Sequence, residues 1–189
     1  ECEERNLLRR ASKKLNEMLL YKPLQNAKFQ KEGVKDFKNA ISIYNNPQSD
    51  KTYIGILSRE GEVEETAEFI LLFKNVDKEK ESELKKEKEN FEALIKNLQD
   101  SSIFILNSNS MKLNVIRNSL ASLVPNLEDR FILCSPEIPS IYANSDLIDQ
   151  DRTYEKCKNN IDDNNMYDFA YSFSQGRYIL NPLNEITNV

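Results

Sequence analysis

Apolar residues recur at spacings of three and four in the first part of the chain, which is the pattern of an amphipathic helix. Residues 3–21 follow it, with charged residues between the apolar ones. Residues 34–44 follow it again, until Asn45-Asn46-Pro47 breaks the pattern. We therefore predict two N-terminal helices that pack on the rest of the fold.

Short runs of apolar and β-branched residues predict strands in the middle of the chain. The runs are residues 52–57, 103–106 and 130–134. Residues 111–123, between the last two runs, have helical spacing. This order predicts a βαβ unit at 102–134, with parallel neighbouring strands and a right-handed crossover.

Two interpretations of residues 59–73 remain open. Val63, Ala67 and Ile70 keep helical spacing, which favours a helix. Glu60-Gly61 could instead turn the chain back on itself as a β-hairpin. We favour the helix and keep the hairpin as the alternative.

The charged range 77–98 predicts a long helix. Its first half, 77–90, lacks an apolar face and should project into solvent, whereas the second half should pack. Residues 137–165 form an acidic segment without a regular pattern. Residues 167–173 then alternate aromatic with small or polar residues, which predicts a strand that pairs with 177–180 as a C-terminal hairpin.

Together these elements predict one domain over residues 1–189. We expect a helix-rich α/β or α+β fold with a small, mainly parallel sheet. The N-terminal helices should pack on this sheet, and the C-terminal hairpin should complete it.

Composition narrows the classes of function. The chain has 189 residues and a net charge of -5, which argues against general nucleic-acid binding because such binding needs a basic face. Histidine is absent, which excludes His-based catalytic triads and His metal sites. No apolar run is long enough for a transmembrane helix.

Cysteine usage bears on localisation. Cys2, Cys134 and Cys157 are an odd count without regular spacing, which a reducing cytoplasm explains most simply. Cys134 lies in an apolar run and should be a buried, unreactive thiol. Cys2 lies next to the first residue, so a lipid-anchored or secreted protein is an alternative localisation.

Polar residues follow each of the three predicted strands, where ligands bind in open parallel sheets. The Asn107–Ser110 loop also leads into a predicted helix N-terminus, which favours an anion, and Lys112 could add a positive charge. The interpretation that we favour is that Ser and Asn side chains in this loop cap the helix, which is compatible with a ligand role. The candidate ligand-binding residues are Ser58, Arg59, Asn107, Ser108, Asn109, Ser110, Lys112 and Ser135.

Other constellations give weaker chemical signals. No phosphate-binding loop or dinucleotide motif is present, so we expect no cofactor. Aspartates in the acidic segment lack the spacing of a calcium loop, so we expect no metal site. Tyrosines could stack on a planar ligand, but we favour core and rim packing as their role. The aspartates are Asp146, Asp149, Asp151, Asp162 and Asp163, and the tyrosines are Tyr154, Tyr167, Tyr171 and Tyr178.

The stretch "YIGILSREGEVEETAEFILLF", residues 53–73, resembles the opening strand and first helix of TIR domains, and "SSIFILNSNS" resembles a later TIR strand. The likeness covers about a quarter of the chain. NAD-cleaving members carry a Glu in the helix after that later strand, and residues 111–123 contain none. The resemblance therefore does not imply NAD hydrolysis.

These observations favour a non-catalytic binding or regulatory domain. It would recognise a small polar or anionic ligand at the carboxyl edge of the sheet, or a protein partner through the charged 77–90 helix. One alternative is an enzyme that uses Glu60, Glu62 or Glu137 as acid or base on a nucleotide or sugar. Another is a secreted lipoprotein or toxin-neutralising partner. The sequence does not predict an oligomeric state.

Overall fold

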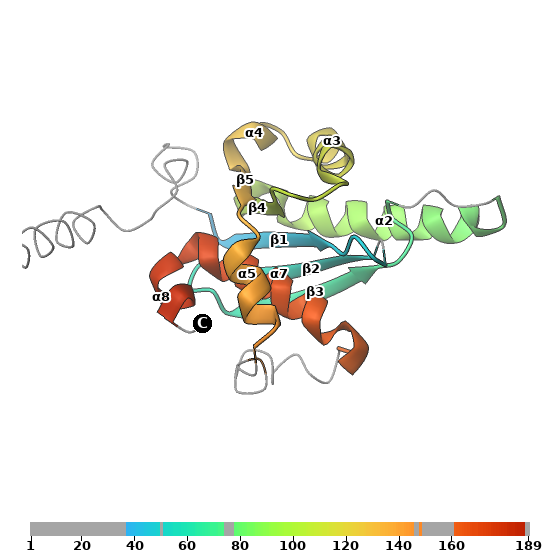
Figure 1. The fold of residues 1–189 in the computed structure, drawn as a ribbon. Coiled ribbons are helices and arrows are strands. Elements are labelled where there is room, and N and C mark those ends of the chain that lie inside the picture. The colour runs from blue at the N-terminus through green and yellow to red at the C-terminus, as the bar shows by residue number, and fades with distance from the viewer. Residues whose placement is uncertain (1–36, 50, 74–77, 146–147, 149–160, 188–189) are drawn as a thin grey trace, which may run out of the picture.

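The computed structural model describes residues 37–49, 51–73, 78–145, 148 and 161–187. The predicted helix over residues 3–21 lies outside these ranges. The described residues form a five-stranded mixed sheet with helices on both faces (Figure 1).

The sheet has the strand order β3-β2-β1-β4-β5. Its strands are β1 (Asn39–Asn45), β2 (Thr52–Ser58), β3 (Val63–Phe69), β4 (Ser102–Asn107) and β5 (Phe131–Cys134). β1, β2 and β3 pair antiparallel, whereas β4 pairs parallel with both β1 and β5. The prediction of a mainly parallel sheet was therefore wrong, because half of the sheet is an antiparallel meander.

Two helical layers cover the sheet. The longer helices are α2 (Glu81–Leu98), α3 (Leu113–Leu123) and α7 (Met166–Leu180). One core packs α2 and α3 on the sheet, through residues such as Phe91 and Ile116, and the other packs α5 and α7 on the opposite face. The shorter helices are α4 (Leu127–Arg130), α5 (Glu137–Ala143), α8 (Pro182–Thr187) and the 3-10 turns η3 (Lys78–Lys80), η4 (Gln99–Ser101) and η7 (Asp163–Asn165).

The prediction of a helix over 34–44 was wrong in the described part, where β1 begins at Asn39. β1 lies at the centre of the sheet, so residues 40–45 are all buried, on alternating faces. A strand covered on both faces reads as a continuous apolar run rather than as an alternation. The apolar residues of β1 also fall at helical spacing, and for this reason the pattern predicted a helix.

Residues 59–73 form a hairpin, so the favoured helix was wrong and the alternative is confirmed. The Ser58 N–H donates to Glu62 O at 2.8 Å, and the chain turns at Gly61, where φ is 89°. Only glycine adopts this conformation without steric cost. Val63 and Phe69 are buried at the two ends of β3, and the residues between them are more exposed.

The predicted C-terminal hairpin was also wrong, because residues 166–180 form one helix, α7. Residues 168–176 and Ile179 of α7 are buried between the sheet, α5 and α8. No polar face therefore marks this segment as a helix. Its alternating aromatic residues point to different neighbours around the helix. Phe173, for example, packs against β2, whereas Tyr171 packs against β1.

Several predictions are confirmed. Residues 52–57, 103–106 and 131–134 lie in strands, whereas Arg130 ends α4, and β4, α3 and β5 form the predicted βαβ unit with parallel strands. α2 is exposed in its first half and buried at Phe91 and Ile95 in its second. The segment 137–165 is not wholly irregular, since α5 begins at Glu137. In the described part of the chain, no helix combines the length and apolarity that a membrane crossing needs.

Candidate functional site at the carboxyl edge of the sheet

The carboxyl ends of β1, β4 and β5 lie at one edge of the sheet because these three strands are parallel. Ile43 of β1 pairs with Leu106 of β4, and Asn107 of β4 pairs with Cys134 of β5. The loops that follow the three strands therefore start side by side. Ligands of open α/β sheets bind at such an edge.

The loop after β4 contacts the loop after β5. The Ser108 N–H donates to Cys134 O at 2.9 Å, which brings the Asn107–Ser110 loop beside Ser135. Ser108, Asn109 and Ser135 are exposed. Two of the three predicted polar junctions are thus neighbours.

Side chains of the Asn107–Ser110 loop stabilise the loop itself rather than cap α3. Asn107 Oδ1 accepts from the Asn109 N–H at 2.8 Å, and Ser110 Oγ accepts from the Lys112 N–H at 3.3 Å. α3 begins at Leu113 after Lys112 as N-cap, and no side chain makes a cap hydrogen bond there. The prediction that a Ser or Asn caps this helix was therefore wrong.

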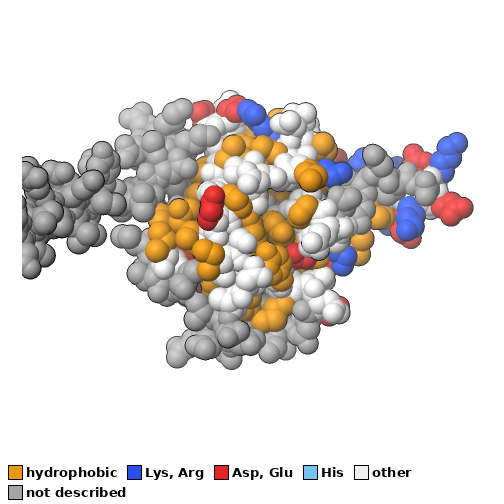
Figure 2. Space-filling model, viewed as in Figure 1, with side chains coloured by type: hydrophobic (Ala, Val, Ile, Leu, Met, Phe, Trp, Pro, Cys, Tyr) orange, Lys and Arg blue, Asp and Glu red, His pale blue; other side chains and the backbone are white. Residues whose placement is uncertain are grey.

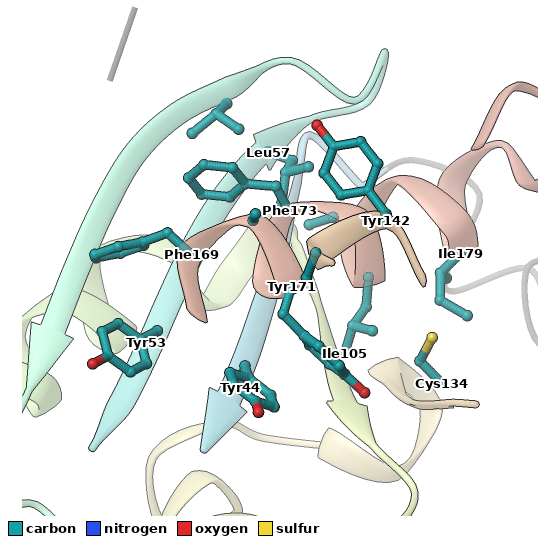
Figure 3. Close-up of a cluster of buried hydrophobic side chains, with 14 of the residues drawn as sticks. Tyr44, Tyr53, Leu57, Ile105, Cys134, Tyr142, Phe169, Tyr171, Phe173 and Ile179 are labelled. Atoms are coloured by element: carbon teal, nitrogen blue, oxygen red, sulfur yellow. The ribbon is translucent and has the colours of Figure 1, made fainter. Parts of the chain in front are cut away.

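α7 reaches this edge through Tyr171. Asn107 Nδ2 donates to the Tyr171 hydroxyl at 2.6 Å, and the Tyr171 ring stacks on Tyr44, with centroids 4.0 Å apart (Figure 3). Burial raises the pKa of both tyrosines well above the ordinary value, so both hydroxyls are neutral. Tyr167, one turn earlier, is 36% exposed. These contacts join α7 to the ends of β1 and β4.

A buried carboxylate lies next to the stack. Asp168 is 6% exposed, and both its oxygens accept from Asn46 Nδ2, at 2.8 and 3.0 Å. This contact ties the turn after β1 to the first turn of α7. Burial raises the pKa of Asp168, although the hydrogen bonds from Asn46 and Tyr53 and the charge of Lys51 act in the opposite direction.

The hydrogen bonds continue from Asp168 toward β3. The Tyr53 hydroxyl lies within reach of both Asp168 and Asn165 Oδ1, the latter at 3.0 Å, and its single proton can donate to either of them. Asn165 Nδ2 donates to Glu68 Oε2 at 2.9 Å, and Lys51 Nζ pairs with Glu68 Oε1 at 2.9 Å. The network thus links β1, β2, β3 and the start of α7.

Ser58 and Arg59 lie at the opposite edge from Asn107. Asn39, at the start of β1, pairs with both Ser58 and Ser102, so the end of β2 and the start of β4 lie at the same end of the sheet, on either side of β1. β2 runs antiparallel to β1, which is the reason that its carboxyl end is not with the others. Arg59 lies over the Phe37 ring at 5.7 Å. The structure therefore does not bring these two candidates together with the other six.

The carboxylates of the proposed enzyme alternative do not converge. Glu60 and Glu62 belong to the β2–β3 turn at the Ser58 edge, whereas Glu137 follows β5 at the Asn107 edge. Among the described residues no group of His, Cys, Asp or Glu side chains could hold a metal ion. Residues 146–147 and 149–160 of the acidic segment, which include Asp149 and Asp151, lie outside them.

The remaining candidate residues from the sequence are Cys134, Tyr178 and Tyr154. Cys134 is buried, as predicted, and burial together with the charges of Glu137 and Glu185 raises its pKa to about 12, so it is a neutral thiol. Tyr178 packs against the α7-side core, and Tyr154 lies outside the described residues.

Sequence reasoning missed Asp168 and Asn46 as a pair. Asp168 is the only acidic residue in the aromatic stretch 166–180. A lone carboxylate among residues expected to be buried needs a hydrogen-bond donor nearby, and that requirement was the available signal. The partner is 122 positions away, so the sequence alone gave no means of naming it.

Comparison with known proteins supplies no relatives from which to assign the site. No protein-family model matches the chain, and no curated protein matches it significantly.

Proposed function

We propose that the protein is a non-catalytic binding domain that recognises a small polar ligand at the carboxyl edge of β1, β4 and β5. The contact that carries the proposal is the Ser108 N–H to Cys134 O hydrogen bond, which joins two polar loops at that edge. The residues that would contact the ligand are Ser108, Asn109, Ser110, Lys112 and Ser135.

The chemistry of these residues defines the ligand class. Hydroxyl and amide groups donate and accept hydrogen bonds, so they suit a molecule with both kinds of group. Lys112 adds one positive charge, whereas the Asp168 carboxylate lies three positions before Tyr171 on α7. Because residues three apart are neighbours on a helix, Asp168 adds negative charge close to the edge when it is ionised. An anion would therefore bind less tightly than a neutral polar molecule of similar shape while Asp168 is ionised.

The proposal is tested by binding measurements on the full chain with two probes, ribose as a neutral polyol and inorganic phosphate as an anion. The variant Asn109→Ala removes an exposed amide from the loop, and Ser58→Ala removes a hydroxyl from the opposite edge as the matched control. We expect Asn109→Ala to weaken saturable binding of at least one probe and Ser58→Ala to leave it unchanged. Equal effects of the two variants, or no saturable binding of either probe, would count against this site.

A second candidate function is contact with a protein partner through the first half of α2. Residues 81–86 are exposed apart from Leu84, and Figure 2 shows charged side chains of both signs at that projecting end of the molecule. Reversing charges with Lys85→Glu and Lys86→Glu should then remove a partner that the unaltered protein retains. The same partner retained by both proteins would argue against this surface.

A further inference from the structure

The contact between Asp168 and Asn46 joins the candidate edge to a titratable group. Asn46 Nδ2 lies within hydrogen-bond distance of both carboxylate oxygens, which is the arrangement of an ionised acceptor. Asn46 also stabilises its own turn, because its Oδ1 accepts from the Gln48 N–H at 2.8 Å and its N–H donates to Lys51 O at 2.9 Å. Asp168 therefore contacts the same side chain that stabilises the turn after β1.

Protonation changes what this carboxylate can do. A protonated carboxyl has a hydroxyl that donates, so one of the two oxygens stops accepting from the Asn46 amide. The Tyr53 oxygen lies beside Asp168 and can accept the new proton while its own hydroxyl donates to Asn165. The protonated state thus has a partner for its new donor, and it holds Asn46 less tightly.

We propose that Asp168 is a proton-controlled latch, which fixes the turn after β1 when it is ionised and loosens that turn when it is protonated. The consequence for ligand binding rests on the proposed function. Protonation would also remove the negative charge near the edge, so an anionic ligand would bind more tightly as the pH falls.

The groups that face Asp168 set the pH at which the latch acts. Lys51 and Glu68 form an ion pair that lies nearby, and their opposite charges act on Asp168 in opposite directions. The neutral hydroxyls that interact with Asp168 come from Tyr44 on β1 and Tyr53 on β2. Burial of Asp168 outweighs these contacts and raises its pKa, so the transition lies above the range of an exposed aspartate.

The latch is tested by an NMR titration of the full chain without ligand. The carboxyl carbon of Asp168, the side-chain amide of Asn46 and the backbone amide of Gln48 are followed together. We expect all three signals to change with one shared apparent pKa, above 3.8, the ordinary value for an aspartate. Independent transitions, or an Asp168 transition at or below that value, would overturn the proposal.

Three variants test whether protonation of Asp168 causes the pH-dependent changes at Asn46 and Gln48. Asp168→Asn should abolish the transition at Asn46 and Gln48, and Glu68→Gln should retain it. Asn46→Ala removes a donor that favours the ionised form, so it should raise the apparent pKa of Asp168 and keeps the test possible if Asp168→Asn fails to fold. A transition that persists in Asp168→Asn, or an Asp168 pKa that Asn46→Ala leaves unchanged, refutes the latch.

The titration distinguishes the latch from the proposed function because it uses no ligand. If the shared NMR transition is observed but neither ribose nor phosphate binds, the latch is supported and the proposed function is refuted. If phosphate binds at the edge, its affinity should rise as the pH falls through the Asp168 transition, and this dependence should disappear in Asp168→Asn. A pH dependence that survives in that variant would show that Asp168 does not control the edge.

Discussion

Gly176 of α7 lies directly against Leu57 of β2. A Cβ atom on residue 176 would come within 2.7 Å of Leu57 Cδ1 and 3.3 Å of Ser42 Cβ. The helix can lie this close to the sheet only because residue 176 has no side chain. The close approach also lets other residues of α7 reach the backbone of β1, β2 and β4.

We predict that Gly176→Ala lowers the free energy of unfolding, because α7 must move away from Leu57. Overpacking of this kind lowers the free energy of unfolding by about 1–3 kcal/mol. The higher helix propensity of alanine offsets up to about 1 kcal/mol of that loss. Denaturant unfolding measures the difference. Asn118→Ala, at an exposed position of α3, is the control and should not destabilise the protein. A Gly176→Ala protein as stable as this control would mean that α7 is not packed so closely.

Ser172 stabilises the contact between α7 and the sheet through its hydroxyl. Ser172 Oγ accepts from the Gly55 N–H at 3.1 Å and donates to Ser42 O at 2.9 Å, in a fully buried position. Its removal leaves buried backbone groups with one partner fewer, which costs about 1–3 kcal/mol. We therefore expect Ser172→Ala to lower the urea midpoint clearly.

The matched control for this substitution is Ser122→Ala. Ser122 Oγ also donates to a backbone oxygen, that of Ser119 at 2.7 Å, but it lies on an exposed helix surface. Water replaces that hydrogen bond, so the midpoint should hardly change. Equal losses in the two variants would contradict the role given to burial.

A buried ion pair holds α8 against α7. Arg177 Nε lies 3.1 Å from Glu185 Oε2, and the Glu185 side chain is only 2% exposed. The Arg177 guanidinium also lies 4.8 Å from the centre of the Tyr142 ring on α5. Glu185→Ala leaves this cation without its carboxylate and should cost about 3–5 kcal/mol.

The exposed pair of Arg117 and Glu128 provides the comparison. Its side chains are 43% and 67% exposed, so Glu128→Ala should change the free energy of unfolding by no more than about 1 kcal/mol. Thermal or urea unfolding of the two variants measures both values. A loss in Glu185→Ala as small as that in Glu128→Ala would show that the buried pair does not hold α8.

Asp168 should make the folded protein less stable as the pH rises. Its folded pKa lies above the ordinary value of 3.8, so on raising the pH the unfolded state ionises first. Between the two pKa values the folded state binds more protons, and the free energy of unfolding falls. Asp168→Asn removes this contribution, so its stability relative to the unaltered protein should increase with pH across that window. Urea midpoints measured over a pH series test this, and parallel curves for the two proteins would contradict it.

The elements that were predicted correctly from the sequence are those whose pattern of apolar and polar residues reflects how they are buried. The run TYIGIL and the unit from β4 to β5 were found because short apolar runs are separated by clear polar loops. β1 and α7 were missed for the same physical reason as each other. Both are buried almost all round, so tertiary contacts and not one exposed face decide their conformation.

The candidate site was predictable only in part. The loop that begins at Asn107 and the residue Ser135 are neighbours, as expected from two consecutive parallel strands. Ser58 was misplaced because β1 was not predicted as a strand, and β2 takes its direction from its antiparallel pairing with β1. Asp168 could not be paired with Asn46, since that contact exists only once α7 lies on β1.

The most direct test of the binding edge is NMR chemical-shift mapping of the full chain during titration with ribose and, separately, with inorganic phosphate. We predict saturable changes in the backbone amides of Ser108, Asn109 and Ser135, with none at Ser58 on the opposite edge. Asn109→Ala should weaken these changes, and Ser58→Ala should not. Changes confined to the Ser58 edge, or no saturable change at the three amides with either probe, would contradict the central claim.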